Sequence, residues 1–173
     1  MSNLPLEIEY KFLIEYPDTN ILSSQPYYKK EVMCQLYLCI PDENGQYTNC
    51  RIRKTVAGDK VRYIKTFKKP VSMMTRIEVE SEISKEEFES LSKFLKPGFS
   101  PIEKVRHSFS LHGFTYEVDV FPFWSDRAFM EVEVQSEIVT PPCPDFIRVI
   151  KDVTEDVRYR NSALAKEIIT EDI

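Results

Sequence analysis

Apolar and polar positions alternate with a period of two over most of this 173-residue chain, and that period indicates β-strands. The alternation predicts eight strands, at residues 6–15, 32–40, 48–56, 61–68, 74–83, 101–111, 114–121 and 128–136. Several are joined by short turns, and strands joined as hairpins pair antiparallel. Eight such strands can remove their exposed edges by closing into a barrel. We therefore expect an α+β, mainly β fold: an eight-stranded antiparallel closed β-barrel with a few flanking helices, as a single domain over residues 1–173.

Three segments depart from this period and predict helices. Ser84 and Glu87 form a capping box, in which each side chain satisfies a backbone N–H of the other residue. Apolar residues then recur at helical spacing up to residue 95, and a Pro-Gly pair ends the helix. A second short helix is expected at residues 145–150. A third is expected to begin near Asn161, a good N-cap residue, and to run through Ile168.

Charged side chains occupy one face of many predicted strands. In the first strand, Glu7, Glu9 and Lys11 share one face. The pattern recurs at Arg51 and Arg53, Lys65, Arg76, Glu78 and Glu80, Lys104 and Arg106, Glu117 and Asp119, and Glu131 and Glu133. For any one strand, a solvated face of a half-exposed sheet is the ordinary interpretation. Its repetition on seven strands favours a charged, water-filled tunnel inside the barrel.

Acidic and basic pairs in one tunnel each need a counter-charge. Carboxylate pairs are suited to a hard divalent cation such as Mg²⁺, which keeps several waters and takes one or two carboxylates. Pairs of arginine and lysine are suited to phosphate oxygens. A metal-bound polyphosphate satisfies both sets at once, and this is the physical reason to expect E-x-E and R-x-R sequences in the same lumen.

The opening sequence Glu7-Ile8-Glu9-Tyr10-Lys11 resembles the E-x-E-x-K signature of the CYTH domain, or triphosphate tunnel metalloenzyme, family. The later charged pairs look like that family in their order, and residues 153–165 are similar to its closing segment. The resemblance covers residues 6–168. It implies an eight-stranded tunnel, Mg²⁺ or Mn²⁺ as cofactor and a small-molecule substrate that carries a triphosphate. Many members have a basic residue where this chain has Tyr10, whose side chain should point away from the tunnel.

The resemblance also implies roles for individual residues. Expected metal ligands are Glu7, Glu9, Glu131 and Glu133. Expected phosphate contacts are Arg51, Arg53, Lys65, Arg76, Lys104 and Arg106, and the expected catalytic residues are Lys11, Glu9 and Lys65. Other expected lumen positions are Glu78, Glu80, Glu117 and Asp119. A C-terminal basic contact is left open between Lys151, Arg158 and Arg160, each of which is equally suited to the surface.

Hydrolysis of inorganic triphosphate to pyrophosphate and phosphate is the expected reaction, because this substrate needs no pocket for a base or head group. The alternatives are a class IV adenylate cyclase, which converts ATP to cyclic AMP and pyrophosphate, a thiamine triphosphatase, and a non-catalytic polyphosphate- or nucleotide-binding module. No sequence feature demands an adenine site. Both E-x-E pairs favour an enzyme over a binding module.

The charge balance and the N-terminus limit the partners. The formal net charge is −5, so we expect no nucleic-acid partner, which would require a basic surface stripe. No apolar run is long enough to span a bilayer, and the N-terminus lacks the basic and apolar regions of a signal peptide. We therefore expect a cytoplasmic protein with no membrane partner. The sequence leaves open whether it forms a homodimer.

Overall fold

Nine β-strands, all paired antiparallel, form the sheet of the computed structural model, which describes residues 6–41 and 50–171. They are β1 (Leu6–Glu15), β2 (Lys29–Leu38), β3 (Cys50–Ala57), β4 (Lys60–Pro70), β5 (Thr75–Glu82), β6 (Ile102–Leu111), β7 (Phe114–Val120), β8 (Arg127–Glu133) and β9 (Val149–Asp152). Their order in the sheet is β5-β4-β3-β2-β6-β7-β8-β1-β9. The first two residues of the predicted third strand, 48 and 49, lie outside the described residues.

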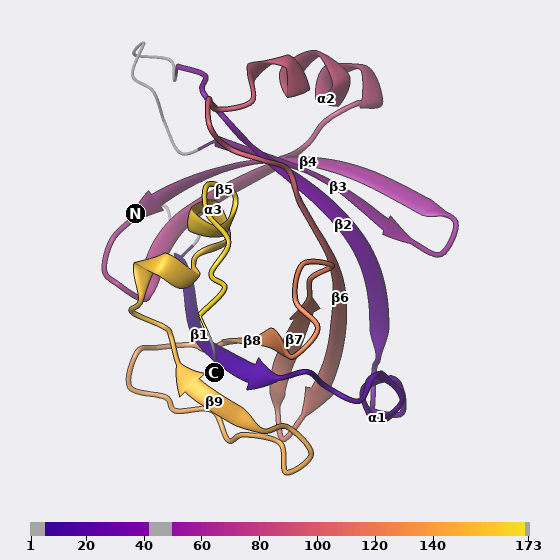
Figure 1. The fold of residues 1–173 in the computed structure, drawn as a ribbon, viewed down its shortest axis with the longest axis vertical. Coiled ribbons are helices and arrows are strands. Elements are labelled where there is room, and N and C mark those ends of the chain that lie inside the picture. Colours follow the sequence, from indigo (N-terminus) through magenta and orange to yellow (C-terminus); the bar gives the residue numbers. More distant parts are fainter. Residues whose placement is uncertain (1–5, 42–49, 172–173) are drawn as a thin grey trace.

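A further pairing, between β5 and the beginning of β1, closes the first eight strands into a barrel (Figure 1). The predicted eight-stranded antiparallel closed barrel is thus confirmed. β5 and β9 share the edge of β1 that β8 does not occupy. β5 pairs with it only as far as Ile8, and β9 pairs with it from Phe12 to Ile14. β9 is an additional strand that satisfies the edge of β1 beyond the reach of β5.

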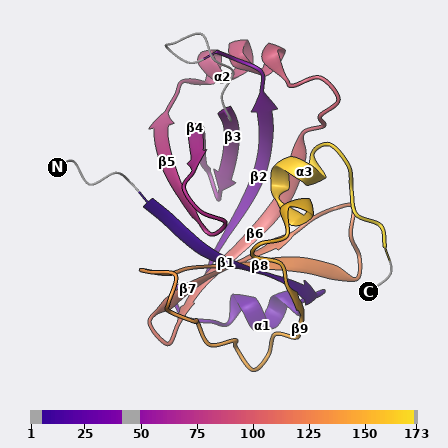
Figure 2. The same ribbon diagram turned by 90° about the vertical axis from the view of Figure 1, so that its left-hand side faces the viewer.

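The helices are short. They are α1 (Thr19–Ser23), α2 (Lys85–Leu91) and α3 (Asn161–Leu164), with 3-10 helices at Ser92–Phe94 and Val157–Tyr159. Ser84 caps α2 as predicted, because its side chain accepts a hydrogen bond from the N–H of Glu87 at 3.0 Å. Figures 1 and 2 show α1 and α2 at opposite ends of the molecule. No helix in the described part of the chain is long and apolar enough to cross a membrane.

Of the two helix predictions near the C-terminus, the first is wrong and the second is right in its start but too long. Residues 145–150 form a turn and then enter β9, because the free edge of β1 supplies backbone hydrogen-bond partners there. The helix expected to run through Ile168 ends at Leu164, and its N-cap is Arg160, one residue before Asn161. The sequence analysis did not predict α1. Asp18 is its N-cap, and the Asp18 side chain accepts a hydrogen bond from the N–H of Asn20.

The apolar cores lie mainly outside the barrel wall, because the inner face of most strands is charged. One core packs Leu36, Leu38 and Ile52 against residues of α2. Another packs the outer face of β7 and β8 against Leu22 of α1 and Ile147. A third core contains Leu13 and Phe129, which share the inner faces of β1 and β8 with the charged residues, and packs them against Tyr159, Leu164 and Ala165. The C-terminal segment therefore packs over one end of the lumen.

Candidate functional site

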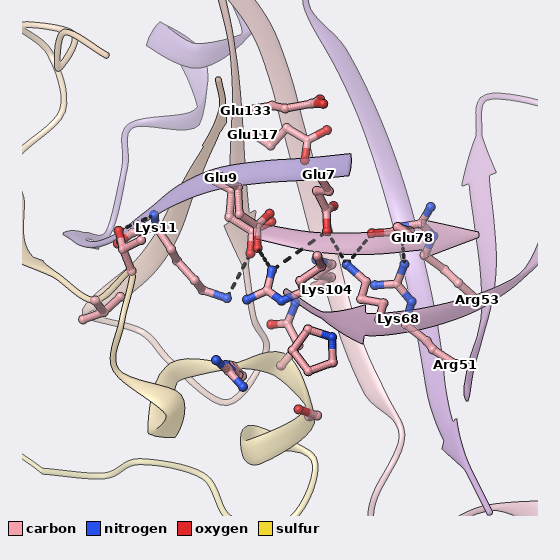
Figure 3. Close-up of a pocket in the computed structure, with 18 of the residues that line it drawn as sticks. Glu7, Glu9, Lys11, Arg51, Arg53, Lys68, Glu78, Lys104, Glu117 and Glu133 are labelled. Carbon is pink, nitrogen blue, oxygen red and sulfur yellow. Dashed lines mark hydrogen bonds and ion pairs between the residues drawn. The ribbon is translucent and has the colours of Figure 1, made fainter. Parts of the chain in front are cut away.

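The interior of the barrel is a cavity of about 450 Å³. Strands β1 and β3 to β8 contribute the charged residues Glu7, Glu9, Lys11, Arg51, Arg53, Lys68, Arg76, Glu78, Glu80, Lys104, Arg106, Glu117, Glu131 and Glu133. The remaining lining residues are Tyr37, Pro70, Val153, Thr154, Asp156, Arg160, Asn161 and Ser162. Figure 3 shows acidic and basic side chains that point into the same space, with several ion pairs between them. The charged faces predicted for six of the seven strands thus meet in one lumen, and the exception is the face of Lys65 on β4.

Strand register decides which side chains face each other. Glu9 of β1 lies opposite Glu133 of β8, and Lys11 lies opposite Glu131. On the next strand along, Glu117 of β7 also lies opposite Glu131. Like-charged neighbours on adjacent strands repel each other, so the acidic residues of this region require cations close by.

Four residues form what we call the β6–β8 cluster: Lys104, Arg106, Asp119 and Glu131. Arg106 donates to both oxygens of Asp119 at 2.7 Å and to Glu131 at 2.6 Å. Lys104 also donates to Asp119, whose side chain is completely buried. Arg106 forms a further ion pair with Glu117.

Electrostatics in the β6–β8 cluster follow from this burial. Burial alone would raise the pKa of Asp119, but Arg106 and Lys104 hold it below its ordinary value. Burial would likewise raise the pKa of Glu131, and Lys11, at 2.9 Å, and Arg106 hold it well below. Burial, together with the nearby charge of Arg106, lowers the pKa of Lys104 to about 8. The carboxylates of this cluster are therefore ionised and compensated by protein cations.

Five residues on the facing wall form what we call the β3–β5 cluster: Arg51, Arg53, Lys68, Glu78 and Glu80. Their arginine contacts are longer, since Arg51 lies 3.3 Å from Glu78 and Arg53 lies 3.6 Å from Glu80. Lys68 pairs with Glu78 at 2.7 Å. The Nε atoms of both arginines are buried and find no hydrogen-bond partner in the described residues. These two N–H groups are therefore buried and unpaired, and the ion pairs of Arg51 and Arg53 are made by their terminal nitrogens.

Glu7, Glu9 and Glu133 differ from Glu131 in their electrostatics. Glu9 lies 2.7 Å from Arg76, and Glu7 lies 2.9 Å from Lys68. Burial, followed by the charges of Glu131 and Glu7, raises the pKa of Glu9. Burial, followed by Glu7 and Glu9, also raises the pKa of Glu133. Within the described residues, no three His, Cys, Asp or Glu side chains converge as metal ligands. The carboxylate oxygens of these three residues nevertheless suit a hard divalent cation, which takes oxygen ligands.

Lys65 and Asp119 are the predicted lumen residues that do not line the cavity. Thr66, the next residue along the chain, contacts Arg51 inside the barrel, so Lys65 lies on the outer face of β4 opposite Ile52. There its Nζ pairs with Glu87 of α2 at 3.0 Å. The inward lysine of β4 is Lys68, which the sequence analysis missed. Lys68 is two residues after Thr66 and so lies on the same face of β4. The sequence alone could not identify this face, because it requires the pairing of Thr66 with Arg51.

Asp119 was expected in the lumen, but its side chain is completely buried in ion pairs with Lys104 and Arg106.

The C-terminal segment supplies residues that were only partly anticipated. Arg160 lines the cavity, whereas Lys151 and Arg158 are exposed side chains that pair with Asp156 at 3.5 and 2.8 Å. Arg160 has no ion pair within residues 6–41 and 50–171, and burial together with Arg76 lowers its pKa. Tyr10 donates to the carbonyl oxygen of Glu137 and lies outside the lumen, as expected.

Comparison with known proteins identifies relatives over nearly the whole chain. The CYTH domain profile matches residues 5–140. An inorganic triphosphatase from Acetivibrio thermocellus is 32% identical over 163 residues, which cover 92% of this chain and 93% of that protein. A crystal structure of an inorganic triphosphatase is 31% identical, with a TM-score of 0.53 over 94% of this chain and 95% of the other. A protein from Pyrococcus horikoshii shares the fold at 24% identity, with a TM-score of 0.56 over 76% and 80% of the two chains.

Proposed function

The chain belongs to the CYTH domain family, and we propose that it is a triphosphatase that hydrolyses inorganic triphosphate to pyrophosphate and phosphate inside the barrel. The observation that carries this proposal is the cavity itself, in which cations and carboxylates from seven barrel strands face one space. Its relatives of similar length include inorganic triphosphatases.

The lining of the cavity favours inorganic triphosphate over a nucleotide or thiamine triphosphate. A nucleobase or thiazolium ring binds between apolar and aromatic side chains. The described lining has only Tyr37, Pro70 and Val153 of that kind, and all its other residues are polar or charged. A class IV cyclase would also need such a wall for adenine. Inorganic triphosphate needs none, since every part of it is an anion.

The basic residues would hold the substrate. We expect the β3–β5 cluster to bind phosphoryl oxygens first, because Arg51 and Arg53 line the cavity and their ion pairs are long. Arg76 and Arg160 would add charge from β5 and the C-terminal segment. Lys11, whose Nζ lies 2.9 Å from Glu131 and 4.0 Å from the centre of the Phe129 ring, would stabilise charge on the transferred phosphoryl group. Such transfers depend on positioning and charge stabilisation more than on covalent chemistry by the protein.

CYTH triphosphatases are a metal-dependent class of enzyme, and we expect Mg²⁺ or Mn²⁺ here. Glu7, Glu9 and Glu133 would hold the ion, because their carboxylates line the cavity together and Glu9 lies opposite Glu133 in the register of β1 and β8. Glu131 would contribute less, since Lys11 and Arg106 already neutralise it. When bound, a divalent cation neutralises phosphoryl oxygens and lowers the pKa of a bound water.

The test is a substrate panel measured with Mg²⁺ or Mn²⁺: inorganic triphosphate, ATP, thiamine triphosphate and pyrophosphate, with phosphate and cyclic AMP both quantified. We expect rapid phosphate release from inorganic triphosphate, lost on removal of the metal. Glu9→Ala should lower this rate roughly 10²-fold or more, by analogy with the loss of other electrostatic contacts. Cyclic AMP from ATP would replace the hydrolase with a cyclase. Full activity of Glu9→Ala would contradict the metal assignment.

A further inference from the structure

The barrel closes where β1 meets β5, and this closure is short. Residues 75–77 of β5 pair with residues 6–8 of β1, whereas β8 pairs with β1 over residues 9–15. We call the pairing of residues 6–8 with residues 75–77 the seam. Within the seam, Glu7 lies opposite Arg76. A short pairing opens locally more easily than a long one, so the seam needs support from outside the sheet.

The seam aligns residues that we expect to bind metal with one that we expect to bind phosphate. Arg76 Nη1 lies 2.7 Å from Glu9 Oε1 and 3.9 Å from Glu7 Oε2. The two glutamates are expected metal ligands, and Arg76 is an expected phosphate contact. A slip of one residue along a strand turns its side chains to the opposite face. The position of β5 against β1 therefore decides whether these carboxylates and this cation meet in the lumen.

Glu137 bridges the seam on the outer face of the barrel. It follows β8, which ends at Glu133, and its Oε1 accepts hydrogen bonds from Ser72 Oγ and Thr75 Oγ1, each at 2.5 Å. Its carbonyl oxygen accepts a hydrogen bond from Tyr10 Oη at 3.2 Å. Glu137 thus connects the segment after β8 to the outer face of β1 and to the start of β5.

Ser72 organises the turn between β4 and β5. Its Oγ accepts a hydrogen bond from the N–H of Thr75 at 3.0 Å, and its own N–H donates to the carbonyl oxygen of Thr75 at 3.0 Å. The Thr75 side chain is buried. One carboxylate therefore holds both the turn and the residue that directly precedes Arg76.

Glu137 itself lies outside the lumen. Its side chain is exposed and does not line the cavity. The hydrogen bonds from Ser72 and Thr75 hold the pKa of the Glu137 carboxyl below its ordinary value, so the group is an ionised acceptor at neutral pH. Hydrogen bonds to an ionised acceptor are stronger than those between neutral groups. Glu137 is therefore placed to support the seam and not to touch a ligand.

We propose that Glu137 is a positioning residue of the triphosphatase site, which holds β5 against β1 and so keeps Arg76 aligned with Glu7 and Glu9. This inference rests on the proposed function. Without the carboxylate, the start of β5 would separate from β1, and the metal-binding side of the lumen would lose its alignment. The β6–β8 cluster would keep its ion pairs, because they do not involve the seam.

Glu137→Leu tests this proposal because it removes the acceptor outside the lumen and leaves every lining residue in place. The matched control is Glu89→Leu, since Glu89 is an exposed glutamate of α2. Titration with Mn²⁺ without substrate, followed by electron paramagnetic resonance, should show that Glu137→Leu binds the ion roughly 10-fold more weakly, as for the loss of outer residues that orient metal ligands. The control should bind Mn²⁺ like the wild type. Glu137→Gln should retain most of the affinity, because its amide oxygen can accept from the same two hydroxyls.

Steady-state kinetics separates positioning from a purely structural role. In Glu137→Leu, the Mn²⁺ concentration that gives half the maximal rate with inorganic triphosphate should rise roughly 10-fold, while kcat at saturating Mn²⁺ stays within about twofold. Loss of folded protein would instead lower kcat and leave the half-saturating concentration unchanged. Hydrogen exchange should be faster at the backbone amides of residues 6–8 and 75–77 and unchanged in β6 and β7.

Mn²⁺ affinity and half-saturation of Glu137→Leu equal to those of the control would overturn the positioning role. Equal losses in Glu137→Leu and Glu137→Gln would refute the hydrogen-bond mechanism. Mn²⁺ binding and hydrogen exchange need no turnover. A wild type that binds Mn²⁺ without hydrolysing triphosphate would therefore contradict the proposed function alone, and the Mn²⁺ affinity of Glu137→Leu would still decide on Glu137. A wild type that binds no Mn²⁺ would overturn both.

Discussion

The two walls of the lumen carry similar residues and use them differently. In the β6–β8 cluster, Arg106 makes short contacts to Asp119 and Glu131, and these side chains are at most 10% exposed. In the β3–β5 cluster, the arginine contacts are 3.3 to 3.6 Å long and Glu80 is 40% exposed. The difference indicates that the first wall is a preorganised ionic core, whereas the arginines of the second wall are held by longer ion pairs and can be engaged more readily by a ligand.

The largest effect should come from breaking the β6–β8 cluster. Asp119→Asn removes the buried charge that compensates Lys104 and Arg106, and we expect the free energy of unfolding to fall by about 3–5 kcal/mol. The matched variant Glu80→Gln removes a half-exposed charge from the other wall and should cost about 1 kcal/mol or less. Urea denaturation of the two variants measures both losses in the free energy of unfolding. Equal losses would contradict the proposed difference between the walls.

Arg53→Met tests whether the β3–β5 cluster binds phosphate. The substitution keeps much of the apolar stem of the side chain, so the free energy of unfolding should change little. The loss of a phosphate donor should lower kcat/KM for inorganic triphosphate by about 10²- to 10³-fold. Steady-state kinetics combined with a melting curve checks both expectations. A variant that unfolds easily but keeps its activity would assign Arg53 to the structural wall.

A smaller effect is expected from the C-terminal segment. Arg160→Ala removes a cation that lines the cavity. Arg158→Ala removes an exposed cation that pairs with Asp156. We expect kcat/KM to fall by about 10-fold in the first variant and to stay unchanged in the second. If the two variants lose activity equally, the segment acts through its fold and not through the Arg160 charge.

The smallest effect is expected at Lys65, which pairs with Glu87 outside the barrel. Lys65→Ala should keep the activity of the wild type, because exposed ion pairs contribute little. Lys68→Ala, on the inner face of the same strand, should lose activity clearly. Initial rates with inorganic triphosphate separate the two lysines, and a reversed result would place the register of β4 in doubt.

Much of the barrel could be predicted because alternation is a local property of the sequence. Glu7, Glu9 and Lys11 needed only strand parity to be assigned to one face. Lys65 failed because β4 has basic and apolar residues on both faces, and only its pairing with β3 identifies the inner one. β9 was missed for a related reason: its partner is β1, more than 130 residues earlier in the chain. Long-range register and packing of the C-terminal segment are not encoded in a local period.

The most direct test of the proposed activity is to follow inorganic triphosphate with the purified protein and Mg²⁺ by phosphorus NMR. The account predicts that triphosphate disappears while pyrophosphate and phosphate accumulate in equal amounts, and that a chelator stops the reaction. Triphosphate that persists in the presence of Mg²⁺ or Mn²⁺ would contradict the proposal that this charged lumen is a triphosphatase site.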